Sequence, residues 1–120
     1  MSTPTSHDRL VVLAADYMAA QGYTRVRASH TDRFAACDQI GDYIPDVTAF
    51  SSSTFVVVEA ESRDGLALAH TEAQWRTFHK HANQVGGHFI AVVNKTDEAA
   101  ARVLQTRICG NAANVRVWTL

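Results

Sequence analysis

Residues 44–61 read IPDVTAFSSSTFVVVEAE, and this stretch decides the fold. Residues 54–60 contain four consecutive apolar side chains, a pattern typical of a central strand covered on both faces. Residues 47–50 predict a second strand, and Pro45 is tolerated just before it because a strand start needs no backbone N–H. The serines at 51–53 predict a turn. We therefore expect the two strands to pair as a hairpin.

Helical and strand patterns continue on both sides of this hairpin. Upstream, apolar residues at helical spacing predict a helix that Ser6 caps and Gly22 ends, and residues 23–29 predict a strand. Residues 30–43 are polar and predict an irregular loop. Downstream we expect a helix over 68–85, a strand over 88–93, a helix over 97–106 capped by Thr96 and a strand over 115–119. The order αβββαβ(αβ) predicts an α/β fold with a mixed β-sheet flanked by helices.

Composition predicts one globular domain over residues 1–120. The chain is 47% hydrophobic and 19% charged, with a net charge of -1, so total charge gives no sign of a polyanion binder. Two cysteines, Cys37 and Cys109, are too few for a disulfide framework, which predicts reduced thiols in a cytoplasmic protein. No apolar run is long enough for a membrane span, so we expect no membrane partner.

Three acidic residues converge on the predicted hairpin. Glu59 and Glu61 are two apart at the end of the central strand, so they share a face with its apolar row. Asp46 begins the neighbouring strand and should lie beside them. Charges next to a buried row are costly unless they are paired, hydrogen-bonded or bound to a metal. A divalent ion relieves repulsion among carboxylates, and oxygen ligands favour Mg²⁺ or Mn²⁺.

Each carboxylate also has a structural interpretation. Asp46 can be a carboxylate at a strand start, and Glu61 can be the solvated end of its strand or can pair with Arg63. Glu59 is harder to explain in this way, because it directly follows the apolar run.

Pro45-Asp46, followed after about a dozen residues by Glu59-Ala60-Glu61, resembles the PD-(D/E)XK pattern of the restriction-endonuclease-like nuclease superfamily. The resemblance covers roughly residues 6–95. It implies that Asp46 and Glu59 are metal ligands and that Glu61 stands where the family has lysine. A glutamate cannot supply the positive charge of that lysine, but it can add a ligand or act as a base for water.

The resemblance also implies two residues outside the hairpin. Gln74 lies on the helix after the third strand, where the family often has an assisting glutamine or lysine. Asp8 loosely fits the acidic position that some members carry on the first helix. Lys80 is the candidate for a displaced lysine, although helical geometry points it away from the face of Gln74.

The resulting functional prediction is a metal-dependent nuclease that hydrolyses phosphodiester bonds in DNA or RNA, with DNA favoured. Asp46, Glu59 and Glu61 would form its site with Mg²⁺ or Mn²⁺, assisted by Gln74. The resemblance also implies a possible homodimer, in which a second copy of a small domain of this kind would help to embrace a duplex. The alternative is a catalytically inactive binding or assembly module of the same fold. An unrelated small ligand-binding domain is a third hypothesis, but the chain has no Gly-rich phosphate loop.

Overall fold

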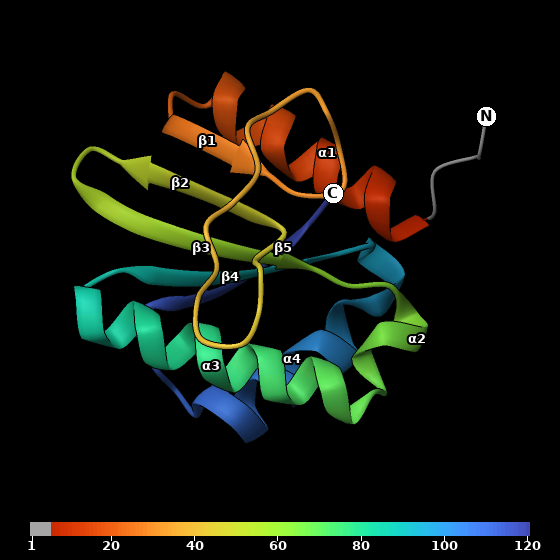
Figure 1. Cartoon of the computed structure of the whole chain (residues 1–120). Coiled ribbons are helices and arrows are strands. Elements are labelled where there is room, and N and C mark those ends of the chain that lie inside the picture. Colours follow the sequence, from red (N-terminus) through yellow and green to blue (C-terminus); the bar gives the residue numbers. More distant parts are fainter. Residues whose placement is uncertain (1–5) are drawn as a thin grey trace.

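The computed structural model describes residues 6–120, in which five strands form one sheet between two helical layers (Figure 1). The elements in chain order are α1 (Ser6–Ala20), β1 (Thr24–Ala28), β2 (Val47–Ser51), β3 (Thr54–Ala60), α2 (Arg63–Leu66), α3 (Ala69–Val85), β4 (His88–Val93), the 3₁₀ turn η1 (Lys95–Asp97), α4 (Glu98–Cys109) and β5 (Val115–Thr119). No helix among residues 6–120 is long and apolar enough to cross a membrane.

The sheet has the order β1-β2-β3-β4-β5 and is mixed. Strands β1, β2 and β3 pair antiparallel, whereas β3, β4 and β5 pair parallel. Val47 lies opposite Val58 and Ser51 lies opposite Thr54, so the predicted hairpin is confirmed. The parallel pairs need crossover connections, which α2 with α3 and then α4 supply. The predicted α/β class with a mixed sheet flanked by helices is thus confirmed.

Strand β3 is buried on both faces, as its apolar run predicts. Val56 and Val58 pack against α1, where Met18 belongs to the same core cluster. Val57 points to the opposite face and packs in a second cluster with Trp75 of α3. Figure 1 shows α1 on one side of the sheet and α3 with α4 on the other. The side chains of β3 therefore alternate between two cores.

The start of α4 differs from the prediction. Thr96 is not its cap, because residues 95–97 form a 3₁₀ turn and Asp97 occupies the N-cap position. The Asp97 carboxylate accepts a hydrogen bond from Arg63 Nε at 2.9 Å, and this ion pair links η1 to α2. The helix also extends to Cys109, where Gly110 follows with a φ of 62°. Glycine adopts this positive φ without a steric penalty, which favours the helix end at that point.

The short helix α2 is absent from the sequence prediction. The Ser62 side chain caps it by accepting a hydrogen bond from the Gly65 backbone N–H. Four residues are too few to show a helical period, which explains why the pattern gave no signal. The preceding helix α1 begins at Ser6 itself, one residue earlier than a cap at Ser6 implies.

The loop between β1 and β2 is irregular, as predicted, and its ends are tied together. Ser29 N donates to Asp46 O at 2.9 Å, and Ser29 Oγ donates to Pro45 O at 2.9 Å. In its middle the loop passes over α3, where Gly41 has a φ of 59° and a Cβ would lie 2.9 Å from Thr77. The tie at Ser29 brings the start of β2 next to His30.

Candidate metal centre

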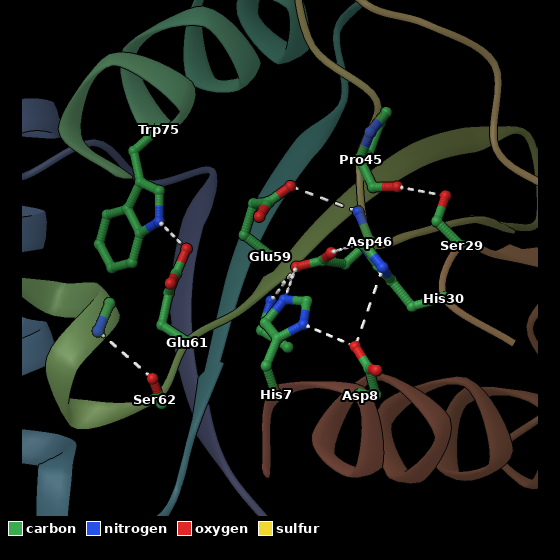
Figure 2. A network of polar contacts seen from close by, with 12 residues as sticks. His7, Asp8, Ser29, His30, Pro45, Asp46, Glu59, Glu61, Ser62 and Trp75 are labelled. Carbon is green, nitrogen blue, oxygen red and sulfur yellow. Dashed lines mark hydrogen bonds and ion pairs between the residues drawn. The ribbon is translucent and has the colours of Figure 1, made fainter. Parts of the chain in front are cut away.

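Asp46 and Glu59 lie side by side at one end of the hairpin. Continuing the β2–β3 register by one residue places them opposite each other. Asp46 N donates to Glu59 Oε1 at 3.3 Å, and Ala60 N donates to Asp46 Oδ2 at 2.9 Å. Only 3% of Asp46 and 2% of Glu59 is exposed. The structure therefore brings together the two carboxylates that the sequence pairs (Figure 2).

Glu61 is buried directly after the end of β3 and faces α3. Trp75 Nε1 donates to Glu61 Oε1 at 3.4 Å. A Cβ at Gly65 would lie 2.6 Å from Glu61 Oε2, so a larger residue at this position in α2 would displace the carboxyl group. The alternative pairing of Glu61 with Arg63 is wrong, because Arg63 binds Asp97. Figure 2 shows Glu61 turned toward the indole of Trp75, beside the Asp46–Glu59 pair.

Two histidines complete the surroundings of Asp46, and the sequence did not indicate either. His7 Nε2 lies 3.1 Å from Asp46 Oδ2, and His30 Nε2 lies 3.4 Å from Asp46 Oδ1. Asp8 stands behind them, with its Oδ1 3.2 Å from His7 Nδ1 and 3.8 Å from His30 Nδ1. Asp8 thus lies near the site, as the resemblance implies, but the two imidazoles separate it from Asp46.

Gln74 and Lys80 are placed differently from this cluster. Gln74 is half-buried on α3 and forms no side-chain hydrogen bond with any residue between 6 and 120. Its neighbour Trp75 makes the contact between α3 and the carboxylates. Lys80 is exposed and shares a surface depression with Arg76 and His79. An assisting role for Gln74 stays a prediction.

The buried carboxyls of Asp46 and Glu59 respond to each other in opposite directions. Burial works against ionisation of Asp46, but hydrogen bonds from His30, His7 and Glu59 outweigh it and lower its pKa. Burial and then the charge of Asp46 raise the pKa of Glu59 well above its ordinary value. One carboxyl therefore holds a negative charge while its neighbour tends to hold a proton, as expected where two adjacent carboxylates cannot both ionise.

The pKa values of the groups around this pair are shifted as well. Burial, followed by the charge of Asp46, raises the pKa of Glu61 to about 7. The hydrogen bond to Asp46 raises the pKa of His7 to about 9 and outweighs the opposing effect of burial. A second hydrogen bond, between His30 and Asp46, likewise raises the pKa of His30. Three acidic side chains and two imidazoles thus share their protons within one cluster.

The metal-free protein is expected to lose stability as the pH rises. Folding gives protonated His7 a hydrogen-bond acceptor in Asp46, which raises its pKa. Its contribution to stability is therefore complete below pH 6.5 and is lost as the pH rises to about 9. Glu61 holds its proton more tightly when folded, which also makes stability fall between pH 4.5 and about 7. The free energy of unfolding in EDTA should fall by on the order of 3 kcal/mol across these windows. Urea unfolding from about pH 5.5 to 9.5 measures it; a constant or rising stability contradicts the proton sharing.

Replacing Trp75 with Phe should cost more stability at high pH than at low pH. Phe retains an aromatic ring beside Phe89 but removes the N–H that Glu61 accepts. Removing this donor costs more stability when Glu61 is ionised than when it is protonated, because the buried charge is then left without a hydrogen-bond donor. We expect about 1 kcal/mol more destabilisation at pH 8.5 than at pH 5.5 in urea unfolding. Trp118→Phe is the control, since Trp118 packs on Tyr17 and Tyr23. Equal costs for Trp75→Phe at both pH values contradict a role for this bond.

The cluster has the donor set of a metal centre. His7, His30 and Asp46 each offer one ligand atom, and these atoms lie within 4.8 Å of one another. Glu59 adds carboxylate oxygens beside Asp46. Comparison of the chain with protein-family models, curated proteins and solved structures finds no match. The functional argument therefore rests on the chemistry of this cluster.

Proposed function

We propose that this chain is a divalent-metal-dependent nuclease of the PD-(D/E)XK type that hydrolyses phosphodiester bonds, in DNA more than in RNA. The buried pair of Asp46 and Glu59 carries the proposal. A fold gains nothing from packing two carboxyls together out of water unless another group uses them. Perturbed acids gathered at one place are typical of functional sites.

The arrangement of the hairpin supports the restriction-endonuclease-like assignment. Asp46 directly precedes β2, the second strand, and Glu59 lies near the end of β3, the third. The element order αβββαβ agrees with the order that the resemblance implies. Strand β3 is central in the sheet, so α1 and α3 protect both of its faces.

Asp46 and Glu59 would hold Mg²⁺ or Mn²⁺ in this proposal. A bound ion supplies an activated water and neutralises charge on the phosphoryl group. The carboxyl oxygens of Asp46 and Glu59 fit such an ion. Burial and the charge of Asp46 raise the pKa of Glu59, so this buried pair lacks a positive charge that would stabilise both carboxylates. A cation next to both carboxyls would remove the repulsion and favour their ionised forms.

Glu61 would act as the base in place of the family's lysine. In the metal-free protein its pKa is raised to about 7, mainly by burial, and a bound cation would favour the ionised form that accepts a proton. Trp75 orients this carboxyl through the indole N–H. The lack of a lysine at this position is thus compatible with catalysis by a carboxylate.

Cleavage assays on single-stranded, duplex and branched DNA test the proposal. The parent should cut at least one substrate with Mn²⁺ and none with EDTA. Glu61→Gln should lower the rate by about 100-fold, the scale of one general base. Glu72→Gln is the matched control, because Glu72 pairs with Arg76 and Arg107 outside the cluster. Cleavage that persists in EDTA, or in Glu61→Gln at the parent's rate, contradicts the proposal.

A catalytically inactive binding module is the second candidate. The contacts of His7 and His30 with Asp46 favour it, because they can satisfy this carboxylate without a metal. A module of this kind should bind nucleic acid equally well in EDTA and in Mn²⁺ and cut none of the substrates. Sedimentation of the same samples tests the expected homodimer.

A further inference from the structure

His7 and His30 come from separate segments and present the same atom to Asp46. His7 lies in the first turn of α1, and His30 lies in the loop after β1. Each points its Nε2 at a different oxygen of the Asp46 carboxylate. The two rings pack edge to face with centroids 5.0 Å apart. Figure 2 shows His7 and His30 next to Asp8, with both imidazoles turned toward the Asp46 carboxylate.

His30 adopts an unfavourable backbone conformation to reach this position. Its φ is 62°, in the left-handed region that non-glycine residues rarely occupy. Such a conformation costs on the order of 1 kcal/mol or more and persists where the surrounding structure requires it, often at functional sites. The tie between Ser29 and Asp46 holds the residue there.

The three ligand atoms lie near the spacing that one bound ion requires. Atoms bound to a metal at about 2.0–2.2 Å in tetrahedral or octahedral geometry lie about 3.0–3.5 Å from one another. The nitrogens of His7 and His30 lie 3.1 Å and 3.4 Å from different oxygens of Asp46, and one ligand atom from each of the three residues lies within 4.8 Å of the other two. The three side chains would have to move closer together to bind one cation.

Asp8 lies where a metal-binding histidine commonly has a carboxylate partner. Its Oδ1 is hydrogen-bonded to His7 Nδ1 at 3.2 Å and lies 3.8 Å from His30 Nδ1, which is an ion-pair distance. Histidines that bind metals commonly donate their second N–H to a carboxylate, which fixes the ring and makes the other nitrogen a better ligand. In the metal-free protein the Nε2–H of each ring donates to an oxygen of Asp46. A cation bound between the rings and the carboxylate would replace these protons, and the Nδ1–H of His7 would still donate to Asp8.

We propose that His7, His30 and Asp46 bind a divalent transition-metal ion, such as Zn²⁺, Co²⁺ or Mn²⁺, through two imidazole nitrogens and one carboxylate oxygen. Imidazole ligands favour these ions over Mg²⁺, which prefers oxygen. A role of this ion in catalysis rests on the proposed function, whereas binding of the ion does not. Asp46 is shared with Glu59, so the ion lies at the proposed nuclease site.

Calorimetric titration of Zn²⁺ into EDTA-treated, dialysed protein tests the histidine ligands. His7→Ala and His30→Asn should each weaken Zn²⁺ binding at least about 10-fold. Asparagine is chosen at position 30 because it tolerates a positive φ. His70→Ala is the matched control, since His70 is exposed on α3, and it should bind as the parent does. Parental Zn²⁺ affinity in both His7→Ala and His30→Asn overturns the inference.

A measurement on the parent protein covers the case in which a variant fails to fold. Long-range ¹H–¹⁵N correlation spectra report each histidine ring separately. One equivalent of Zn²⁺ should shift the Nε2 signals of His7 and His30. The signals of the other four histidines should stay unchanged; these are His70, His79, His81 and His88. Shifts confined to those four, or none, overturn the inference.

These results also separate the inference from the proposed function. Zn²⁺ binding that depends on Asp46 but not on the histidines overturns the inference and leaves the nuclease proposal in place. Binding that depends on the histidines, without cleavage of any substrate, upholds the inference and contradicts the nuclease proposal. Absence of binding by any divalent ion contradicts both.

Discussion

Replacing Asp46 with Asn is expected to abolish metal binding, remove Mn²⁺-dependent cleavage and destabilise the metal-free protein. The amide keeps the shape of the side chain and can still accept the Ala60 N–H. It carries no charge, so His7 and His30 lose the partner that raises their pKa values. Loss of these charge-assisted hydrogen bonds should cost about 2 kcal/mol in the free energy of unfolding near pH 6.

Three measurements check the Asp46 prediction on one preparation. Calorimetry gives the Mn²⁺ affinity, a cleavage assay gives the rate, and urea unfolding in EDTA gives the stability. Asp42→Asn is the matched control, because Asp42 is an exposed residue of the same loop, and it should leave all three unchanged. A variant that binds Mn²⁺ with the parent's affinity contradicts a ligand role for Asp46.

Replacing Glu59 with Gln is expected to abolish metal binding as well, but to stabilise the metal-free protein at high pH. Glu59 is 2% exposed, and burial and the Asp46 charge raise its pKa. Glutamine cannot ionise, and its amide can donate to Asp46 while its oxygen accepts the Asp46 N–H. It therefore removes the cost of a second buried charge, on the order of 1–3 kcal/mol once the parent's Glu59 ionises.

The stabilising effect of Glu59→Gln should depend on pH. At the acidic end of the range, where the raised pKa of Glu59 favours its protonated form, the two proteins should unfold at similar urea concentrations. The difference should grow as the pH rises and Glu59 is forced to lose its proton. Glu98→Gln is the control, since Glu98 forms an exposed pair with Arg102. A Glu59→Gln protein that is less stable than the parent at every pH contradicts the coupling of Glu59 with Asp46.

The two variants make the same chemical substitution, a carboxamide for a carboxyl group, with opposite expected effects on stability. Asp46 is held ionised by its hydrogen-bond partners, whereas Glu59 is held protonated by its surroundings. A structural hydrogen-bond network has no need for the unfavourable second carboxyl. A site that binds a cation needs it, and accepts lower stability without the ion as the cost.

The hairpin and the pairing of Asp46 with Glu59 could be predicted because both follow from local patterns. A continuous apolar run, a serine turn and a two-residue period fix which side chains share a face. The hydrogen bond from the indole N–H of Trp75 to Glu61 could not be predicted, since it depends on how α3 packs against the sheet. The cap of α4 was misplaced because the Asp97–Arg63 contact joins residues 34 positions apart.

His7 and His30 could not be found in the same way. Their approach to Asp46 depends on how α1 crosses the sheet and on how the loop after β1 is tied to Pro45 and Asp46. Neither arrangement leaves a periodic trace in the sequence. Asp8 was reachable only through the resemblance, which placed an acidic residue on the first helix without indicating the histidines in front of it.

Calorimetric titration of Mn²⁺ tests most directly the central claim that these buried carboxyls form a metal centre. The parent, Asp46→Asn and Glu59→Gln should be compared after urea unfolding has shown that all three are folded. The account predicts one saturable binding event in the parent that is absent from both variants. No binding to the parent at millimolar Mn²⁺, or equal binding to all three proteins, would contradict it.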